Sequence, residues 1–287
     1  GLELIRDLIS NAGSFVKTVD AEELIASILI VKPVAVPLTL HATLRDYQIR
    51  GFQWMHNNIS KVGGCILADD MGLGKTIQTI ALLLHMKEAG EFDKSPALVV
   101  CPTSLLSNWM REVNKFAPSM WVKVCDGVHR VRELRSAVGQ KRKRAGNTPD
   151  IVLISYATLR TAVPDLMKVS LPMIVLDEAQ NIKNHSSQIA KACKNVGGNA
   201  SARVALTGTV VENRLAELHS CFDFVLPDYL GKIKCFVDRF SKPVERDRNP
   251  EALDLLKRIT EPFMLRRLKS DSAIISDLPS KVETKHW

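Results

Sequence analysis

The chain has 287 residues, of which 46% are hydrophobic and 24% charged, and its 39 Lys and Arg against 31 Asp and Glu give a net charge of +8. This composition is ordinary for a globular protein and excludes a collagen-like or wholly disordered chain. No apolar run approaches the roughly 20 residues of a membrane-spanning helix, and Glu3, Arg6 and Asp7 interrupt the N-terminal apolar residues, so we expect neither a membrane segment nor a signal peptide.

Two short amphipathic helices are predicted at residues 2–10 and 20–31, and Pro33 and Pro37 then break the helical pattern. We therefore assign residues 1–38 to an N-terminal helical extension and linker. The six cysteines form no Cys-x-x-Cys pair, which favours free thiols in a reducing, intracellular compartment. That compartment would be the nucleus in a eukaryote and the cytoplasm or nucleoid in a prokaryote.

From residue 39 onward, short apolar runs alternate with helical patterns. The runs are continuous in Val, Ile, Leu and Cys, as in strands buried on both faces of a parallel sheet. They lie at residues 64–69, 97–101, 121–125, 151–155, 173–177 and 203–207, with helical patterns clearest at 75–89, 104–116 and 187–195. The alternation predicts an α/β fold, a mostly parallel sheet with helices on both faces. Residues 212–271 are expected to be mainly helical.

A phosphate-binding loop is predicted at residues 68–76, ADDMGLGKT, between an apolar run and a long helix. Glycines there let backbone N–H groups close around phosphate oxygens, and the helix N-terminus favours their negative charge. Lys75 would reach the β- and γ-phosphates of ATP, and the Thr76 hydroxyl would bind Mg²⁺. The expected nucleotide-binding residues are Asp69, Asp70, Met71, Gly72, Leu73, Gly74, Lys75 and Thr76.

Two carboxylates, Asp177 and Glu178, end the apolar run MIVLD and continue as EAQ. Strand ends of this kind lie at the carboxyl edge of the sheet, where ligands bind in open α/β folds. Asp177 would hold Mg²⁺, mostly through water, and Glu178 would orient and activate the attacking water. An Asp-Glu pair alone is also common as a helix cap. After a phosphate-binding loop it predicts an ATPase site with Lys75, Asp177 and Glu178 as the catalytic residues.

Several motifs together resemble the Snf2 (SWI2/SNF2) family of helicase superfamily 2. They are LRDYQIRGFQWM (44–55), DDMGLGKTIQTI (69–80), LVVCPTSLLSNW (98–109), DEAQNIKN (177–184), ALTGT (205–209), MLRRLKSD (264–271) and DLPSK (277–281). The resemblance covers about residues 40–281. It implies a RecA-like P-loop NTPase lobe, expected at 39–240, and a helical interlobe segment, expected at 241–287, that leads to a second lobe. The family also commonly has an acidic residue at the position of Asp69.

The resemblance implies roles for further residues. Gln48 matches the glutamine that reads adenine, since its amide can both donate and accept a hydrogen bond. The positions that match DNA-backbone contacts are Thr103, Ser104, Ser107, Ser155 and Tyr156. The positions that match the motif coupling the nucleotide site to DNA are Thr207, Gly208 and Thr209.

Val210 departs from the family pattern, which usually has proline there. Proline would fix its own φ and restrict Thr209, so Val210 leaves this turn looser. We expect phosphate chemistry to survive and coupling to DNA movement to weaken.

Other side chains are interpreted more plainly. Trp54, Trp109 and Trp121 are expected to pack in the core or against another lobe, and Arg266 and Arg267 are not assigned to catalysis. The basic run KRKR at 141–144 admits three interpretations: a nuclear-localisation signal, a solvated loop or a DNA phosphate contact.

The predicted function is the ATP-binding lobe of a double-stranded-DNA-dependent Snf2-type ATPase, with ATP and Mg²⁺ as cofactors. By resemblance, such a protein translocates along the duplex backbone and remodels protein–DNA complexes without strand separation. Its partners would be double-stranded DNA, DNA-bound proteins and the second RecA-like lobe. The family takes its phosphate-stabilising arginines from that lobe, so the chain alone, which begins with Gly and not Met, is expected to be a nearly inactive fragment.

Two other functions remain open. A strand-separating helicase of the same superfamily shares the phosphate-binding loop and the Asp-Glu-Ala motif, but it does not predict the segments at 264–271 and 277–281. A nucleotide-gated module for a protein partner would bind DNA only incidentally, and ATP turnover independent of DNA would support that function.

Overall fold

The computed structural model describes residues 30–138, 148–208 and 214–271. The predicted helix at 2–10, all but the end of the one at 20–31, the KRKR run, Thr209, Val210 and DLPSK lie outside these ranges. Within the described residues, no helix combines the length and the apolar character that crossing a membrane requires.

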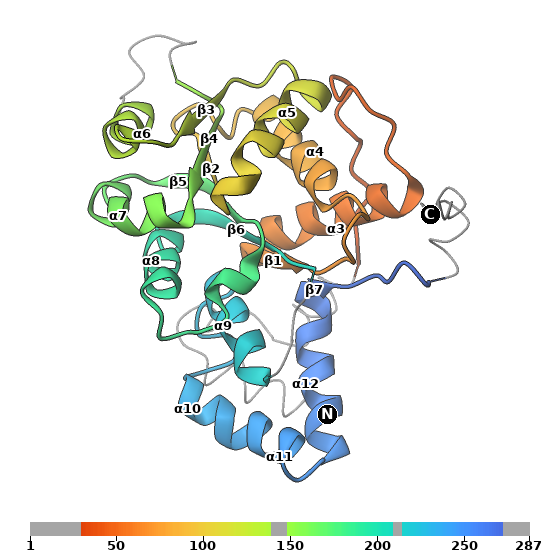
Figure 1. The fold of residues 1–287 in the computed structure, drawn as a ribbon. Helices are drawn as coiled ribbons and strands as arrows, with labels where there is room; N and C mark the ends of the chain where they lie inside the picture. Colours follow the sequence, from red (N-terminus) through yellow and green to blue (C-terminus); the bar gives the residue numbers. More distant parts are fainter. Residues whose placement is uncertain (1–29, 139–147, 209–213, 272–287) are drawn as a thin grey trace, which may run out of the picture.

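A seven-stranded sheet forms the centre of the fold (Figure 1), with the order β3-β4-β2-β5-β6-β1-β7. Its strands are β1 (Gly64–Leu67), β2 (Ala97–Cys101), β3 (Val122–Cys125), β4 (Ile151–Ser155), β5 (Leu171–Leu176), β6 (Ala200–Leu206) and β7 (Met264–Leu265). Every pair of neighbouring strands is parallel. All six predicted strands are present, and the predicted parallel α/β fold is confirmed.

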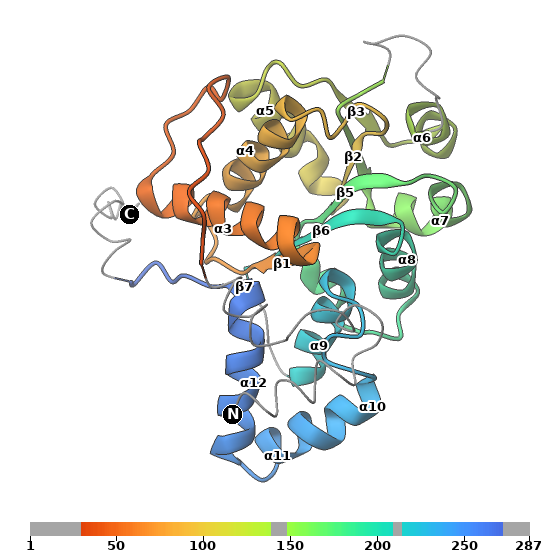
Figure 2. The same cartoon turned by 180° about the vertical axis from the view of Figure 1, so that it is seen from behind.

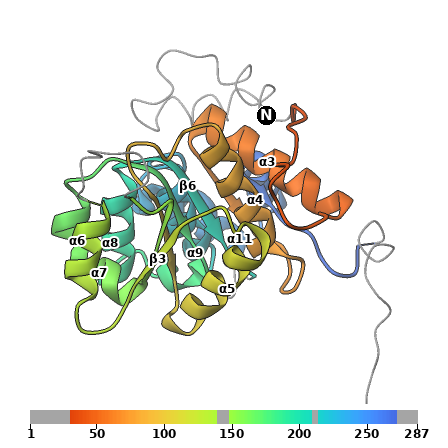
Figure 3. The ribbon, with the colours of Figure 1, turned by 90° about the horizontal axis from the view of Figure 1, so that it is seen from above.

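Helices cover both faces of the sheet, as the view from above shows (Figure 3). One face carries α3 (Asp46–Val62), α4 (Lys75–Glu88) and α5 (Leu106–Phe116). The other carries α6 (Arg130–Val138), α7 (Tyr156–Leu166), α8 (Gln188–Gly197) and α9 (Leu215–Val225). Along β1, Cys65 and Leu67 pack against the core on the face of α3 to α5, and Ile66 packs against the core on the face of α6 to α9. Both faces are therefore dry, which is why the strand sequences are apolar without alternation.

A helical extension lies next to the end of the sheet that β1 and β7 form (Figures 1 and 2). It contains α10 (Ile233–Phe236), a π-helical turn (Val237–Ser241), α11 (Lys242–Glu245), α12 (Pro250–Thr260) and a 3₁₀ turn (Glu261–Phe263). Phe236, Phe240 and Phe263 belong to the same core cluster as α7 to α9. The boundary expected after residue 240 falls within the π-helical turn of this extension, and the division into domains stays a prediction.

The chain then returns to the sheet as β7, which pairs with β1 through Met264 opposite Ile66 and Leu265 opposite Leu67. This strand lies in the segment that was expected to be mainly helical. Two residues are too few to leave a periodic signal, so only the pairing with β1 reveals the strand.

Candidate active site

The carboxyl ends of β1, β5 and β6 meet at one edge of the sheet. β6 lies between the other two strands, with Leu206 opposite Leu67 and Ala205 opposite Leu176. The loop before α4, the Asp177–Glu178 pair and Thr207 follow these three strands directly. Parallel topology thus brings the three predicted motifs together at the place where α/β proteins bind ligands.

The loop between β1 and α4 has the backbone that the glycine pattern predicts. Gly72 has a φ of 84° and Gly74 a φ of 78°, both in the left-handed region that glycine adopts without a steric penalty. A Cβ at Gly74 would lie 2.5 Å from Nε2 of Gln48. Gly74 also directly precedes α4, so the loop ends on the N-terminus of a 14-residue helix, the arrangement that binds phosphate.

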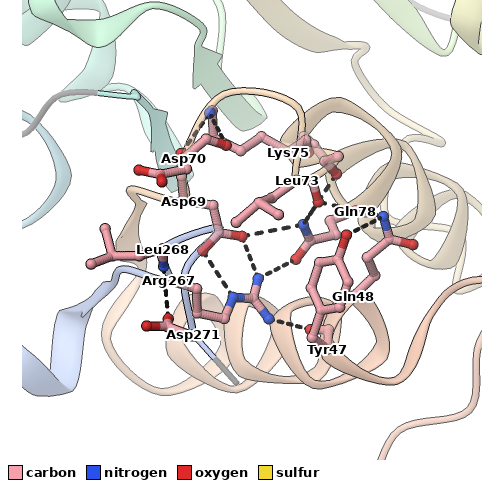
Figure 4. Close-up of polar contacts among 12 residues, drawn as sticks. Tyr47, Gln48, Asp69, Asp70, Leu73, Lys75, Gln78, Arg267, Leu268 and Asp271 are labelled. Carbon is pink, nitrogen blue, oxygen red and sulfur yellow. Dashed lines mark hydrogen bonds and ion pairs between the residues drawn. The ribbon is translucent and has the colours of Figure 1, made fainter. Parts of the chain in front are cut away.

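Lys75, the first residue of α4, folds back over this loop (Figure 4). Its Nζ donates to the carbonyl oxygens of Asp69, at 2.7 Å, and Asp70, at 3.3 Å. Burial lowers the pKa of Lys75, and the carboxylates of Asp69, Glu178, Asp177 and Asp70 oppose that shift. The Lys75 ammonium thus contacts main-chain carbonyls beside the loop and is surrounded by negative charge, in a position from which it can contact an anionic ligand.

Asp177 is held by hydrogen bonds on both carboxylate oxygens. Its Oδ2 accepts from the indole nitrogen of Trp109 at 2.7 Å, and its Oδ1 accepts from the Glu178 amide at 2.9 Å. Burial raises the pKa of Asp177, and the Trp109 hydrogen bond opposes that shift. The side chain is only 8% exposed, so its orientation is fixed before any ligand binds. Trp109 itself lies in the core, as predicted.

Asp177 and the half-buried Thr76 at the start of α4 fit Mg²⁺ in kind, because both offer hard oxygen ligands. Within the described residues, no group of three or more His, Cys, Asp or Glu side chains could hold a metal. One carboxylate and one hydroxyl suit an ion that keeps several waters and takes its other ligands from phosphate.

Glu178 adopts a left-handed backbone conformation, with φ 53° and ψ 54°, which is strained for a residue other than glycine. Its Oε2 accepts a hydrogen bond from Nε2 of Gln180 at 2.6 Å, and Oε1 of Gln180 accepts from the Thr207 hydroxyl at 3.0 Å. Gln180 therefore joins the predicted catalytic glutamate to the predicted coupling motif. Sequence reasoning assigned it no role, although it is the fourth residue of the DEAQ motif.

Gly208 lies close to the phosphate-binding loop. A Cβ at this position would lie 3.1 Å from Cγ of Met71 and 3.8 Å from Nζ of Lys75. Met71 is 71% exposed, so it lies on the open side of the loop. The motif after β6 is thus adjacent to the loop as well as to Glu178.

The chain matches the model of the SNF2-related domain over residues 47–287. It belongs to the SNF2-related domain family. It is 41% identical over 245 residues to YwqA of Bacillus subtilis, a match that covers 85% of this chain and 26% of YwqA. It is 39% identical over 274 residues to the TATA-binding protein-associated factor MOT1 of Saccharomyces cerevisiae, a match that covers 88% of this chain and 14% of MOT1.

Among solved structures, the Sulfolobus solfataricus SWI2/SNF2 ATPase core in complex with double-stranded DNA matches with a TM-score of 0.75 and 41% identity. The match covers 88% of this chain and 50% of that chain. The SNF2-related domain described here thus corresponds to about half of the archaeal chain and to about a quarter of YwqA.

Gln48 lies in the first turn of α3 of the SNF2-related domain, beside the phosphate-binding loop. Its Oε1 accepts from the Arg45 amide at 3.0 Å, and its Nε2 lies 3.4 Å from both the Leu73 carbonyl and the Tyr47 hydroxyl. The side chain is buried and links α3 to the loop. The adenine contact expected of Gln48 stays a prediction.

The side chains of Asp69 and Asp70 contact the segment that follows β7. The Asp69 carboxylate is fully buried and pairs with Arg267 (Figure 4). Oδ2 of Asp70 accepts from the Lys269 amide at 3.0 Å. The nucleotide contact expected of these two residues stays a prediction. Their carbonyls, which position Lys75, are their contribution to the site.

The predicted DNA contacts fall into two groups. Thr103, Ser104 and Ser107 are exposed in the 3₁₀ turn Thr103–Leu105 and the start of α5. Ser155 and Tyr156 are buried: Oγ of Ser155 caps α7 by accepting from the Thr158 amide at 3.1 Å, and the Tyr156 hydroxyl donates to the Asp177 carbonyl at 2.8 Å.

The Ser155 and Tyr156 hydroxyls thus fix α7 and the end of β5, and the DNA-backbone contact expected of these two residues stays a prediction. Trp121 is 47% exposed and lies outside the core, so of its two expected roles packing against another lobe remains.

Proposed function

We propose that this chain is the ATP-binding lobe of a double-stranded-DNA-dependent ATPase that translocates on the duplex backbone and remodels protein–DNA complexes. The observation that carries the proposal is the convergence of Lys75, Asp177 and Glu178 at adjoining strand ends, with Gln180 joining Glu178 to Thr207. The likeness to an archaeal SWI2/SNF2 ATPase core in complex with double-stranded DNA supports DNA as the partner.

In this mechanism the loop amides and Lys75 hold the phosphates of ATP. Mg²⁺, when bound at Thr76 and Asp177, would neutralise charge on the phosphate oxygens. Oε2 of Glu178 orients the attacking water and accepts its hydrogen bond, and Gln180 holds that carboxylate in place from the side of Thr207.

Contact with DNA reaches the site through α5. The exposed Thr103, Ser104 and Ser107 hydroxyls lie at and before the N-terminus of this helix, where they can bind backbone phosphate. Trp109 lies on the same helix and donates to Asp177. A shift of α5 on DNA binding would therefore move the donor that orients the magnesium ligand. Contacts to phosphate alone would make DNA binding strongly dependent on salt.

The test is steady-state ATP hydrolysis with blunt duplex DNA, single-stranded DNA or no DNA, on this chain and on any longer natural protein that contains it. We expect stimulation by duplex only, and higher turnover in a form that also supplies the phosphate-stabilising arginines. Lys75→Ala should abolish turnover. Lys87→Ala is the matched control, because Lys87 lies on the same helix and pairs with Asp150 at 2.9 Å.

High turnover without DNA in the protein and the control would contradict the proposal and favour the nucleotide-gated protein-binding module. Strand separation coupled to turnover would favour the strand-separating helicase.

A further inference from the structure

The segment that follows the helical extension, Met264–Asp271, crosses the phosphate-binding loop; we call it the connecting segment. After the β7 pairing, the Ala68 amide donates to the Leu265 carbonyl at 2.7 Å and the Asp70 amide to the Arg267 carbonyl at 3.0 Å. The first half of the loop is therefore hydrogen-bonded to residues nearly 200 positions later in the chain.

Arg267 anchors this contact through a buried ion pair. Its Nε donates to Oδ1 of Asp69 at 2.8 Å, and its second nitrogen pairs with Oδ2 of the same carboxylate. The Asp69 side chain has no exposed surface and that of Arg267 is 13% exposed. A bidentate ion pair excluded from water has one preferred geometry. It therefore fixes the orientation of the Arg267 guanidinium relative to Asp69 as well as the distance between them.

The same guanidinium reaches two helices of the nucleotide site (Figure 4). It donates to Oε1 of Gln78 on α4 at 2.8 Å and to the Tyr47 carbonyl on α3, and its carbon lies 5.2 Å from the centre of the Tyr47 ring. Because Arg267 holds the oxygen of the Gln78 amide, the Gln78 nitrogen is directed to the loop. That nitrogen donates to the carbonyls of Leu73, at 3.3 Å, and Gly74, at 3.1 Å, and lies 3.4 Å from Oδ2 of Asp69. The Gly74 carbonyl also accepts the main-chain amide of Gln78 at 3.1 Å, so the Gln78 side chain acts mainly on the Leu73 carbonyl.

Holding these two carbonyls also sets the direction of two amides. In a trans peptide the C=O and the following N–H point in opposite directions. Fixing the Leu73 and Gly74 carbonyls toward Gln78 therefore turns the N–H groups of Gly74 and Lys75 to the opposite side. These are the amides at the N-terminus of α4, where phosphate binds.

Gly51 on α3 supplies a second observation. A Cβ at this position would lie 2.0 Å from Oε1 of Gln78 and 2.7 Å from the Arg267 guanidinium. Glycine is unfavourable in the middle of a helix such as α3, yet only glycine leaves room for both side chains here. The α3 surface is thus shaped around the contact between Arg267 and Gln78.

We propose that Arg267 is a positioning residue for the nucleotide: it directs the phosphate-binding amides through Asp69 and Gln78 only while the connecting segment is seated on the loop. Nucleotide binding and seating of this segment are then coupled, and the coupling is reciprocal. The inference rests on the proposed function to the extent that the loop binds ATP.

The test compares Arg267→Lys with Arg266→Lys, the same change at the neighbouring, exposed arginine. Lysine keeps the charge but cannot form the two-pronged contact. We expect Arg267→Lys to raise the Kd for a fluorescent ATP analogue with Mg²⁺ by about tenfold or more, the equivalent of one charge-assisted hydrogen bond. Arg266→Lys should stay within about twofold of the parent chain, the spread expected of a surface substitution.

Hydrogen exchange gives a readout that a purely structural role would not move. The Lys269 amide, which donates to Asp70, should exchange more slowly when nucleotide is added to the parent chain and to Arg266→Lys. In Arg267→Lys the same addition should change its exchange little.

The inference would be overturned if Arg267→Lys lowered the melting temperature but left the nucleotide Kd unchanged. That result would show that Arg267 has a structural role only. Should that variant fail to fold, Gln78→Leu decides, since it keeps both partners of the Arg267–Asp69 pair and removes the side-chain amide that holds the Leu73 carbonyl. Parent-like nucleotide affinity in Gln78→Leu would also overturn the inference. A parent chain that binds no nucleotide would instead refute the proposed function, so the two failures are distinguishable.

Discussion

Replacing Trp109 by phenylalanine removes the donor of the 2.7 Å hydrogen bond to Oδ2 of Asp177 and keeps most of the aromatic packing. The indole is 1% exposed and Asp177 8% exposed, so water cannot replace the lost bond. A hydrogen bond to a charged group contributes about 1.5–3 kcal/mol. We therefore expect Trp109→Phe and Asp177→Ala to couple by about 2 kcal/mol in a double-mutant cycle, measured by urea unfolding near neutral pH.

The destabilisation caused by Trp109→Phe should depend on pH. Burial raises the pKa of Asp177 and the Trp109 bond opposes that rise, so Trp109→Phe should raise the pKa further. The folded chain then keeps a proton that the unfolded chain releases above about pH 3.9, so stability falls as pH rises through the raised pKa. The cost of Trp109→Phe should therefore be larger near neutral pH than in mild acid.

Trp54→Phe, the same substitution at a half-buried tryptophan, is the control for lost packing. Two results together would refute the reasoning. The destabilisation by Trp109→Phe and by Asp177→Ala would add to within about 0.5 kcal/mol, and the destabilisation by Trp109→Phe would not change with pH.

Three further outcomes are expected. Tyr156→Phe should cost about 1 kcal/mol of stability by removing the 2.8 Å bond to the Asp177 carbonyl, yet leave the salt slope of DNA binding unchanged. A slope smaller by about one would show that the Tyr156 hydroxyl contacts phosphate. Gln180→Leu should lower kcat for ATP with little change in KM, because Gln180 contacts Glu178 and not the phosphate-binding loop; parent-like kcat would argue against that role. Burial lowers the pKa of His219, so the unfolded chain binds the proton first as pH falls, and the free energy of unfolding should decrease below about pH 6.5. His219→Gln should flatten that part of the pH profile of urea unfolding. An unchanged profile would contradict this role of His219.

Trp109 and Tyr156 both contact Asp177. Its side chain is held from α5 by Trp109, and its carbonyl is held from α7 by Tyr156. Each of these two helices begins directly after, or a few residues beyond, a strand end at the ligand-binding edge of the sheet. Substitutions of Trp109 and Tyr156, which lie on two different helices, should therefore alter how the Asp177 carboxylate is presented.

Features of this protein that depend on residues close together in the chain could be predicted from the sequence. Continuous apolar runs predicted six strands because both faces of a parallel sheet are shielded from water. The glycines at 72 and 74 predicted a loop whose amides close around phosphate, and both have the positive φ that glycine adopts readily. The order of Lys75, Asp177 and Thr207 along the chain, combined with parallel topology, was enough to bring them to one edge. These signals are local, so each can be recognised within a window of a few residues.

The tertiary structure alone decided which polar group faces which. Asp69 stands within a nucleotide-binding motif but pairs with Arg267, 198 residues away. Tyr156 stands at the end of a strand, as a ligand-contacting residue would, yet its hydroxyl is buried against the Asp177 carbonyl. Periodicity shows that a side chain is near an edge of the sheet, but not whether it turns to solvent or to a partner. That choice is set by the packing of segments distant in sequence, because a buried polar group must find its hydrogen-bond partner wherever the fold places one.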